Sequence, residues 1–279
     1  MTDNDDAYRP PKVNLEVPLK TKEAILREPR RCPLSAGGYW IRDAWHIFKL
    51  RPWLLIGMWG IFFLIMATLS ALPLISIFTA ILTPVFTAGF AFSAVKVEQN
   101  EIVSMEDLFA GFSRNLSTLL GIGGLSLIFA IVAIMLAVLL AVLLLGIDTM
   151  GALFSERTGE EFIKDNLFDK HINTLVLLSI LIYCVLQIPL MMLTWFAPVL
   201  IIRHDVNVWQ AMSLSFKGCL RNMLPFLMFS LIFLGLFIIA LIPLFLGLLV
   251  VAPLFMLTFY TAYKDIYLHT DIYETSFIA

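Results

Sequence analysis

The feature that most constrains the fold is an uninterrupted apolar stretch from Leu224 to Tyr263. Its forty residues include no Asp, Glu, Lys, Arg or His, and charged residues flank it on both sides. A helix rises ~1.5 Å per residue and a hydrocarbon core is ~30 Å thick, so about 20 apolar residues make one crossing. Pro243 stands near the midpoint, where it would disrupt a continuous helix. The stretch therefore predicts two membrane-spanning helices joined by a tight turn.

The rest of the chain repeats this pattern and predicts an all-α, polytopic membrane protein. Only 14% of its residues are charged, whereas soluble domains carry about 25%. The six predicted spans are about 53–72, 74–95, 119–145, 174–202, 224–242 and 244–263. They form a membrane domain over 38–267, between a polar tail at 1–37 and a short tail at 268–279. We expect the first tail to be disordered because its apolar content is too low for it to fold alone.

Three internal units are visible, each with an amphipathic interfacial helix, an outgoing span and a proline-bearing return span. The amphipathic segments are about 38–50, 105–112 and 208–222. All three units start from the same side, so the pattern predicts three hairpins in a parallel repeat. Hydropathy alone is the alternative explanation of this similarity.

The distribution of basic residues predicts the orientation. The loop at 146–173 carries three of the 19 Lys and Arg residues, and a six-span topology puts all the others on the opposite side. Because cytosolic loops are enriched in Lys and Arg, we expect both termini to be cytosolic.

Two further runs carry a resemblance to a family: Arg221–Phe226, with the pattern Arg-Asn-x-Leu-Pro-Phe, and Tyr260–Tyr267, Tyr-Thr-Ala-Tyr-Lys-Asp-Ile-Tyr. With these and the repeated lead-in helices, the chain resembles a family of uncharacterised bacterial six-span inner-membrane proteins over residues 38–267. It is also similar to the membrane portion of some glycerophosphodiester phosphodiesterases. The resemblance implies a bacterial inner membrane and a periplasmic 146–173 loop, which is longer than the family pattern, and it implies no activity.

No Asp, Glu, Lys, Arg or His falls inside the six predicted spans, which argues against proton relays and ion pathways through the membrane. The sequence contains no P-loop, nucleophile elbow, zinc-protease or dinucleotide motif. Its four His and three Cys residues do not pair at metal-ligand spacing. We therefore expect no catalytic residue, no metal, no cofactor and no nucleic-acid partner.

Small residues recur on one face of the third span and predict a helix-packing seam, because small side chains let helices approach closely in lipid. These residues are Gly123, Ser126, Ala130, Ala133, Ala137 and Ala141. The frequency of alanine in apolar helices is the alternative explanation.

Two sets of residues are candidates for binding. Tyr183, Gln187 and Thr258 are polar groups at membrane depth that would line a ligand site, although Gln187 has an alternative role in bonding a neighbouring helix. Recurring arginines at the starts of the outgoing spans suit lipid phosphate, and they equally suit snorkelling at the interface. These arginines are Arg51, Arg114 and Arg221.

The leading functional hypothesis is a non-catalytic accessory or scaffold protein that associates with lipid, a membrane-protein partner or a second copy of itself. The second is a facilitator or transporter of lipid or another hydrophobic solute, with a pathway between the hairpins. A membrane-embedded lipid-modifying enzyme is the third.

Overall fold

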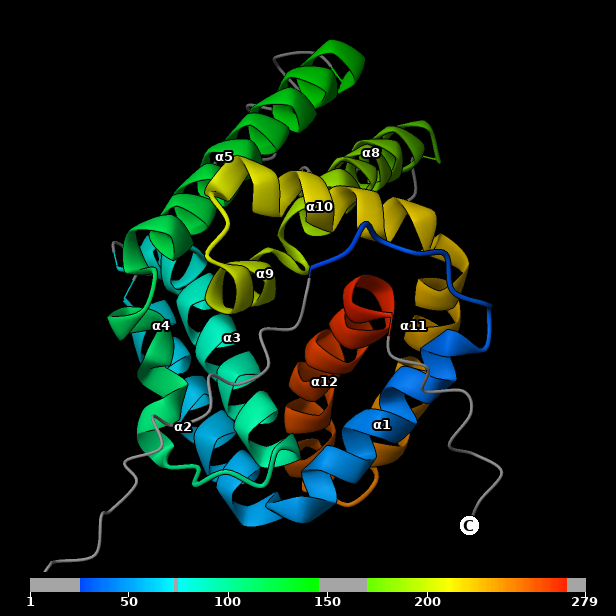
Figure 1. The fold of residues 1–279 in the computed structure, drawn as a ribbon. Coiled ribbons are helices and arrows are strands. Elements are labelled where there is room, and N and C mark those ends of the chain that lie inside the picture. The colour runs from blue at the N-terminus through cyan, green and yellow to red at the C-terminus, as the bar shows by residue number, and fades with distance from the viewer. Residues whose placement is uncertain (1–25, 73–74, 146–169, 270–279) are drawn as a thin grey trace, which may run out of the picture.

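The computed structural model describes residues 26–72, 75–145 and 170–269, and every regular element in these ranges is a helix (Figure 1). Six helical segments are long and apolar enough to cross a membrane. They are α2 (Pro52–Ser70), α3 (Ile77–Glu98), α5 (Leu116–Leu145), α8 (Lys170–Thr194) continued by α9 (Ala197–His204), α11 (Met223–Leu241) and α12 (Leu248–Tyr263). The prediction of an all-α, multi-pass membrane protein is therefore confirmed.

Shorter helices precede the outgoing spans. They are α1 (Ala36–Leu50) before α2, the pair η1 (Met105–Phe109) and α4 (Ala110–Ser113) before α5, and α10 (Val208–Arg221) before α11. In α1 the side chains of Trp40, Ala44 and Ile47 recur at helical spacing and are buried, whereas Trp45 and Lys49 are exposed. One face of this helix therefore packs against the core.

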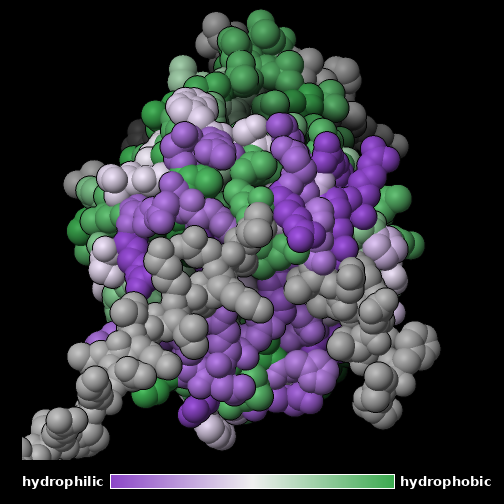
Figure 2. All heavy atoms as spheres, viewed as in Figure 1, coloured by the Kyte–Doolittle hydropathy of each residue, from purple (hydrophilic) through white to green (hydrophobic). Residues whose placement is uncertain are grey.

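Helix α12 lies at the centre of the bundle, with α1, α3, α9 and α11 around it (Figure 1). It is the most deeply buried of the six candidate spans. A π-helical turn, η2 (Lys264–Leu268), continues it at the end that faces the viewer. Hydrophilic residues gather across the middle of this face and hydrophobic ones at its periphery (Figure 2). We call this face the polar end of the bundle.

Helices α5 and α8 pack along each other, and α5 also packs along α3. The far half of α5 projects beyond the other helices (Figure 1) and exposes large apolar side chains such as Ile131, Met135 and Leu139. Exposed apolar side chains on a long helix are typical of contact with lipid.

The three hairpin pairs α2–α3, α5–α8 and α11–α12 all make contact. However, α3 packs more extensively against α5 than against α2, and α12 packs more extensively against α1 than against α11. The parallel repeat stays a prediction, since packing between units is at least as extensive as packing within them.

Two predicted spans differ from the observed helices. The predicted fourth span at 174–202 is broken after Thr194, and α9 begins at Ala197 with Pro198 in its first turn, where the missing N–H costs no helical hydrogen bond. The predicted sixth span at 244–263 begins late, because Leu244 and Phe245 adopt positive φ angles of 51° and 66° in the turn before Leu248.

Residues 26–37, which we predicted as part of a disordered tail, are folded against the polar end. The backbone N–H groups of Arg27 and Arg30 donate to the carbonyl oxygens of Tyr267 and Ile266, at 3.1 and 3.0 Å. The buried Asn222 side chain accepts from the N–H of Cys32 and donates to the carbonyl of Arg30. The low apolar content of this segment did not predict its folded state, because the residues that hold it lie about 190 residues or more away in the sequence. The predicted tails at 1–25 and 270–279 and most of the loop, 146–169, lie outside the described residues.

Candidate functional site

Two adjacent apolar cavities lie between the hairpins and share Trp195 as part of their walls. The first has a volume of about 240 Å³ and lies between α8, the end of α10 and the start of α11. The second has a volume of about 570 Å³ and lies between α2, α8, α11 and α12. Met191 and Ser230 also border both cavities. Together they form a continuous apolar lining along one side of α11.

A helix break holds Trp195 in this position. Pro198 has no N–H with which to continue the ladder of α8, so the chain bends at Trp195 and Phe196 before α9. The buried Ser215 of α10 bridges the break: its hydroxyl donates to the carbonyl of Met192 at 2.7 Å and accepts from the N–H of Phe196 at 3.0 Å, two groups that would bond each other in a continuous helix. The break in the helix therefore lies at the level of α10, and the hydroxyl of Ser215 holds it in place.

Four phenylalanine rings surround the indole of Trp195. Ring centroids lie 5.6 Å away for Phe226, 6.4 Å for Phe229, 6.1 Å for Phe255 and 4.7 Å for Phe259. Three of these contacts are edge-to-face, an arrangement that aromatic quadrupoles favour. The walls of the two cavities are therefore bulky, apolar and packed on one another.

The predicted ligand residues do not come together. Gln187 lines a third cavity of about 330 Å³, together with Ser126, Ala130 and Thr194. Thr258 is buried on α12 and donates its hydroxyl proton to the carbonyl of Phe255 at 2.6 Å. Tyr183 lies one helical turn from Gln187 and is not among the residues that line this cavity.

The predicted packing residues of α5 occupy different environments. At Gly123 the backbones of α5 and α3 approach closely, because a Cβ there would lie 2.4 Å from the carbonyl oxygen of Ile81. Ala133 and Ala141 are buried, and Ala137 is half-buried. Ser126 and Ala130 border the third cavity, where the α5–α8 contact is incomplete.

The three predicted headgroup arginines also lie apart. Arg51 is exposed between α1 and α2. The guanidinium of Arg114 lies 4.5 Å from the centre of the Phe92 ring, and that of Arg221 donates to the carbonyl of Pro29 at 2.6 Å. Two of the three thus already have partners within the protein.

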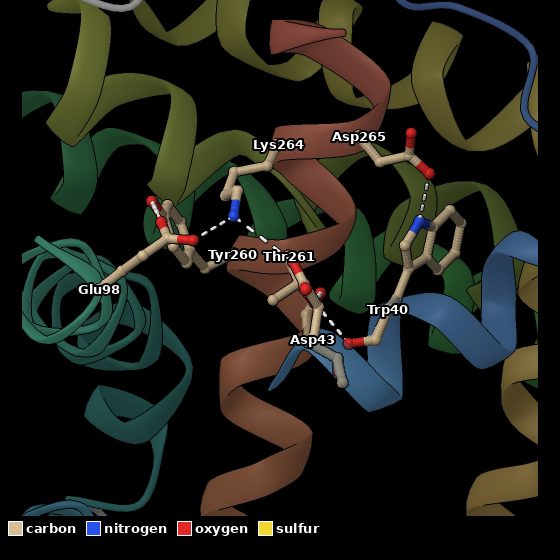
Figure 3. Close-up of polar contacts among 8 residues, drawn as sticks. Trp40, Asp43, Glu98, Tyr260, Thr261, Lys264 and Asp265 are labelled. Atoms are coloured by element: carbon tan, nitrogen blue, oxygen red, sulfur yellow. Dashed lines mark hydrogen bonds and ion pairs between the residues drawn. The ribbon is translucent and has the colours of Figure 1, made fainter. Parts of the chain in front are cut away.

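A polar network that the sequence did not predict joins α1, α3 and α12 at the polar end (Figure 3). Lys264 forms an ion pair with Glu98 and lies 3.4 Å from a carboxylate oxygen of Asp43. The hydroxyl of Tyr260 donates to the other oxygen of Glu98 at 2.6 Å. Three helices far apart in sequence therefore meet at one ammonium group.

Asp265 extends this network to the N-terminal segment. Its carboxylate is fully buried and accepts from Nε1 of Trp40 at 2.7 Å and from the guanidinium of Arg30 at 2.5 Å. The hydroxyl of Thr261 donates to the carbonyl of Trp40 at 2.9 Å (Figure 3). Pairing of this kind is what a buried charge requires.

These contacts correct the expectation that the spans carry no charged side chain. The predicted span stopped at Tyr263, before the first charge, whereas the helical rod continues through η2 and buries Lys264 and Asp265. The spacing of Tyr260, Tyr263, Lys264 and Tyr267 at steps of three, one and three residues was the available signal, since it repeats on a single helix face. We find no group of three or more metal-ligating side chains in the described residues.

Cys219 borders the first cavity from α10. Burial raises the pKa of its thiol to about 12, and a hydrogen bond with Ser215 opposes that shift only in part. The thiol is therefore neutral at physiological pH and contributes an apolar surface to the cavity wall.

Comparison with protein-family models, with curated proteins and with solved structures finds no match for this chain.

Proposed function

We propose that this protein binds membrane lipid and holds a lipid chain in the partly open space between its hairpins, as a facilitator of lipid or hydrophobic-solute movement. The observation that carries the proposal is the pair of cavities bordered by Trp195. Their walls are apolar except for the hydroxyl of Ser230 and the indole N–H groups of Trp59 and Trp195, and no charged side chain lines either cavity. A hydrocarbon chain suits such walls, whereas an ion or a polar solute would lose its hydration there.

The length of the lining fits a lipid chain. Along α11 the lining extends from Met223 to Phe237, which corresponds to about 21 Å at ~1.5 Å per residue. One leaflet occupies about half of the ~30 Å hydrocarbon core, or about 15 Å. Helices α8 and α11 both contribute to the wall of the first cavity but make few direct contacts with each other. A chain from one leaflet would therefore fit between them.

The proposed setting is the bacterial inner membrane, with the polar end and both termini in the cytosol. The excess of basic residues outside the 146–173 loop supports this orientation. The resemblance to six-span bacterial inner-membrane proteins supports the membrane assignment, and membership of that family remains part of the proposal.

An accessory role is the second candidate. The projecting half of α5 favours it, because this part of the helix exposes apolar side chains beyond the rest of the bundle. Another membrane protein or a second copy of this chain would find a helix face there. The cavities favour lipid binding more strongly, since a pure scaffold needs no space between its helices.

Photo-crosslinking tests the proposal. The protein is reconstituted in vesicles that contain a phospholipid with a diazirine in its acyl chain, and crosslinked peptides are mapped by mass spectrometry. We expect crosslinks on cavity-lining residues of α8 and α11. Ser230→Trp would fill space shared by both cavities and reduce these crosslinks, whereas Leu231→Trp, on an exposed position of the same helix, would leave them unchanged. Equal crosslinking in the two variants would refute a lipid site between the hairpins.

A further inference from the structure

Trp195 brings a polar group into an otherwise apolar lining. Its ring is half-buried, and it makes its contacts with phenylalanine rings. No hydrogen bond from its indole N–H is present in the described part of the chain. A tryptophan that is withdrawn from water normally donates this hydrogen to an acceptor.

The N–H of Trp195 remains open to the space beside it. Among the described residues, the one sealed side-chain nitrogen or oxygen without a partner is Nε of Arg203. The indole of Trp195 is therefore not enclosed by protein, although it borders both cavities. An acceptor atom of a molecule bound beside the indole could therefore reach it.

The other polar groups of the first cavity already have partners. The hydroxyl of Ser230 donates to the carbonyl of Phe226 at 2.8 Å. The thiol of Cys219 is neutral and at most a weak donor. The cavity thus offers one strong donor and no cation, which suits a neutral acceptor oxygen rather than a phosphate.

The depth of Trp195 in the membrane further limits the chemical class of the ligand. Ser215 ties the helix break to α10, and α10 carries the exposed Trp209 and Lys217, residues typical of the membrane–water interface. Ester groups of glycerolipids lie at this level, between the charged headgroups and the hydrocarbon. We propose that the ligand is an ester-linked lipid, and that Nε1 of Trp195 donates a hydrogen bond to its ester carbonyl. This inference rests on the proposed function and assigns the ligand class.

Trp59 provides the matched control. It is also an indole, it borders the second cavity but not the first, and it stacks on Phe63 at 5.2 Å. A carbonyl group at the level of α10 would accept a hydrogen bond from Trp195 and not from Trp59.

The test compares a diacyl phospholipid with its dialkyl ether analogue of equal chain length and identical headgroup, which differ only in the two carbonyl groups. Each competes with the diazirine lipid for the wild-type protein, Trp195→Phe and Trp59→Phe. One hydrogen bond corresponds to a preference of about two- to tenfold for the ester in the wild type. We expect Trp195→Phe to lose this preference while it still binds the ether, and Trp59→Phe to keep it. Thermal unfolding in detergent establishes that both variants are folded.

Each outcome separates the two proposals. If the wild type binds ester and ether lipids equally, the carbonyl contact is refuted and lipid binding stands. If neither lipid competes, both proposals fail. Loss of the preference in Trp59→Phe with retention in Trp195→Phe would also overturn the assignment of the donor to Trp195.

Discussion

Removal of the Asp265 carboxylate should destabilise the folded protein by about 3 kcal/mol. The side chain of Asp265 is 0% exposed and accepts from both Trp40 and Arg30. Removing one partner from a buried ion pair costs about 3–5 kcal/mol. Because the Arg30 side chain is 23% exposed, water can solvate part of the released charge, so we place the effect of Asp265→Ala at the lower end of that range.

The free energy of unfolding is measured by titrating SDS into detergent micelles and following tryptophan fluorescence. Asp265→Asn keeps an acceptor oxygen but removes the charge, and we expect a loss between those of Asp265→Ala and the wild type. Glu101→Ala changes an exposed carboxylate and should alter stability by less than about 0.5 kcal/mol. If Asp265→Ala cost no more than Glu101→Ala, Asp265 would not be what secures α12 to α1 and the N-terminal segment.

Three further predictions concern the adjacent residues Gly218 and Cys219 of α10. Cys219 should react with iodoacetamide far more slowly than an exposed thiol, because its pKa of about 12 keeps the reactive thiolate scarce, and the rate measured in detergent should still be rising with pH above pH ~10. Since the folded state favours the neutral thiol, its contribution to stability is present below pH ~9 and falls as pH rises towards 12. Gly218→Ala should lower the free energy of unfolding by about 1–3 kcal/mol, because the new Cβ would lie 2.2 Å from the hydroxyl of Tyr267, whereas Gly60→Ala meets no atom within 4 Å and should be tolerated.

The helical membrane class could be predicted from sequence because one physical rule decides it. A charge-free run such as Leu224–Tyr263 has no stable place in water, and the length of a membrane crossing fixes how many helices it contains. Proline indicated the turn after α11 correctly to within a few residues. These inferences use only properties of neighbouring residues.

The candidate site could not be predicted in the same way, because it depends on contacts between distant segments. The bend at Trp195 depends on the hydroxyl of Ser215, which accepts a hydrogen bond from the N–H of Phe196. These two residues are 19 positions apart in the sequence. The folded state of residues 26–37 depends on Asn222 and on η2. For Gln187 and Thr258 the residue types gave no information on which face of the bundle each would occupy, and they occupy different ones.

Under the proposed function, the distribution of ionic contacts favours entry of a lipid between α8 and α11 over entry elsewhere in the bundle. Among the described residues, the buried ion pairs join α1, α3, η2 and the N-terminal segment, and none joins α8 to α11. The α8–α11 side is instead formed by apolar contacts and bordered by the cavities. Separation of these two helices exchanges protein–hydrocarbon contacts for lipid–hydrocarbon contacts of similar energy, whereas separation of α12 from α1 would expose Asp265 and Lys264. The network at the polar end would therefore hold one side of the bundle rigid while the other side opens to the membrane.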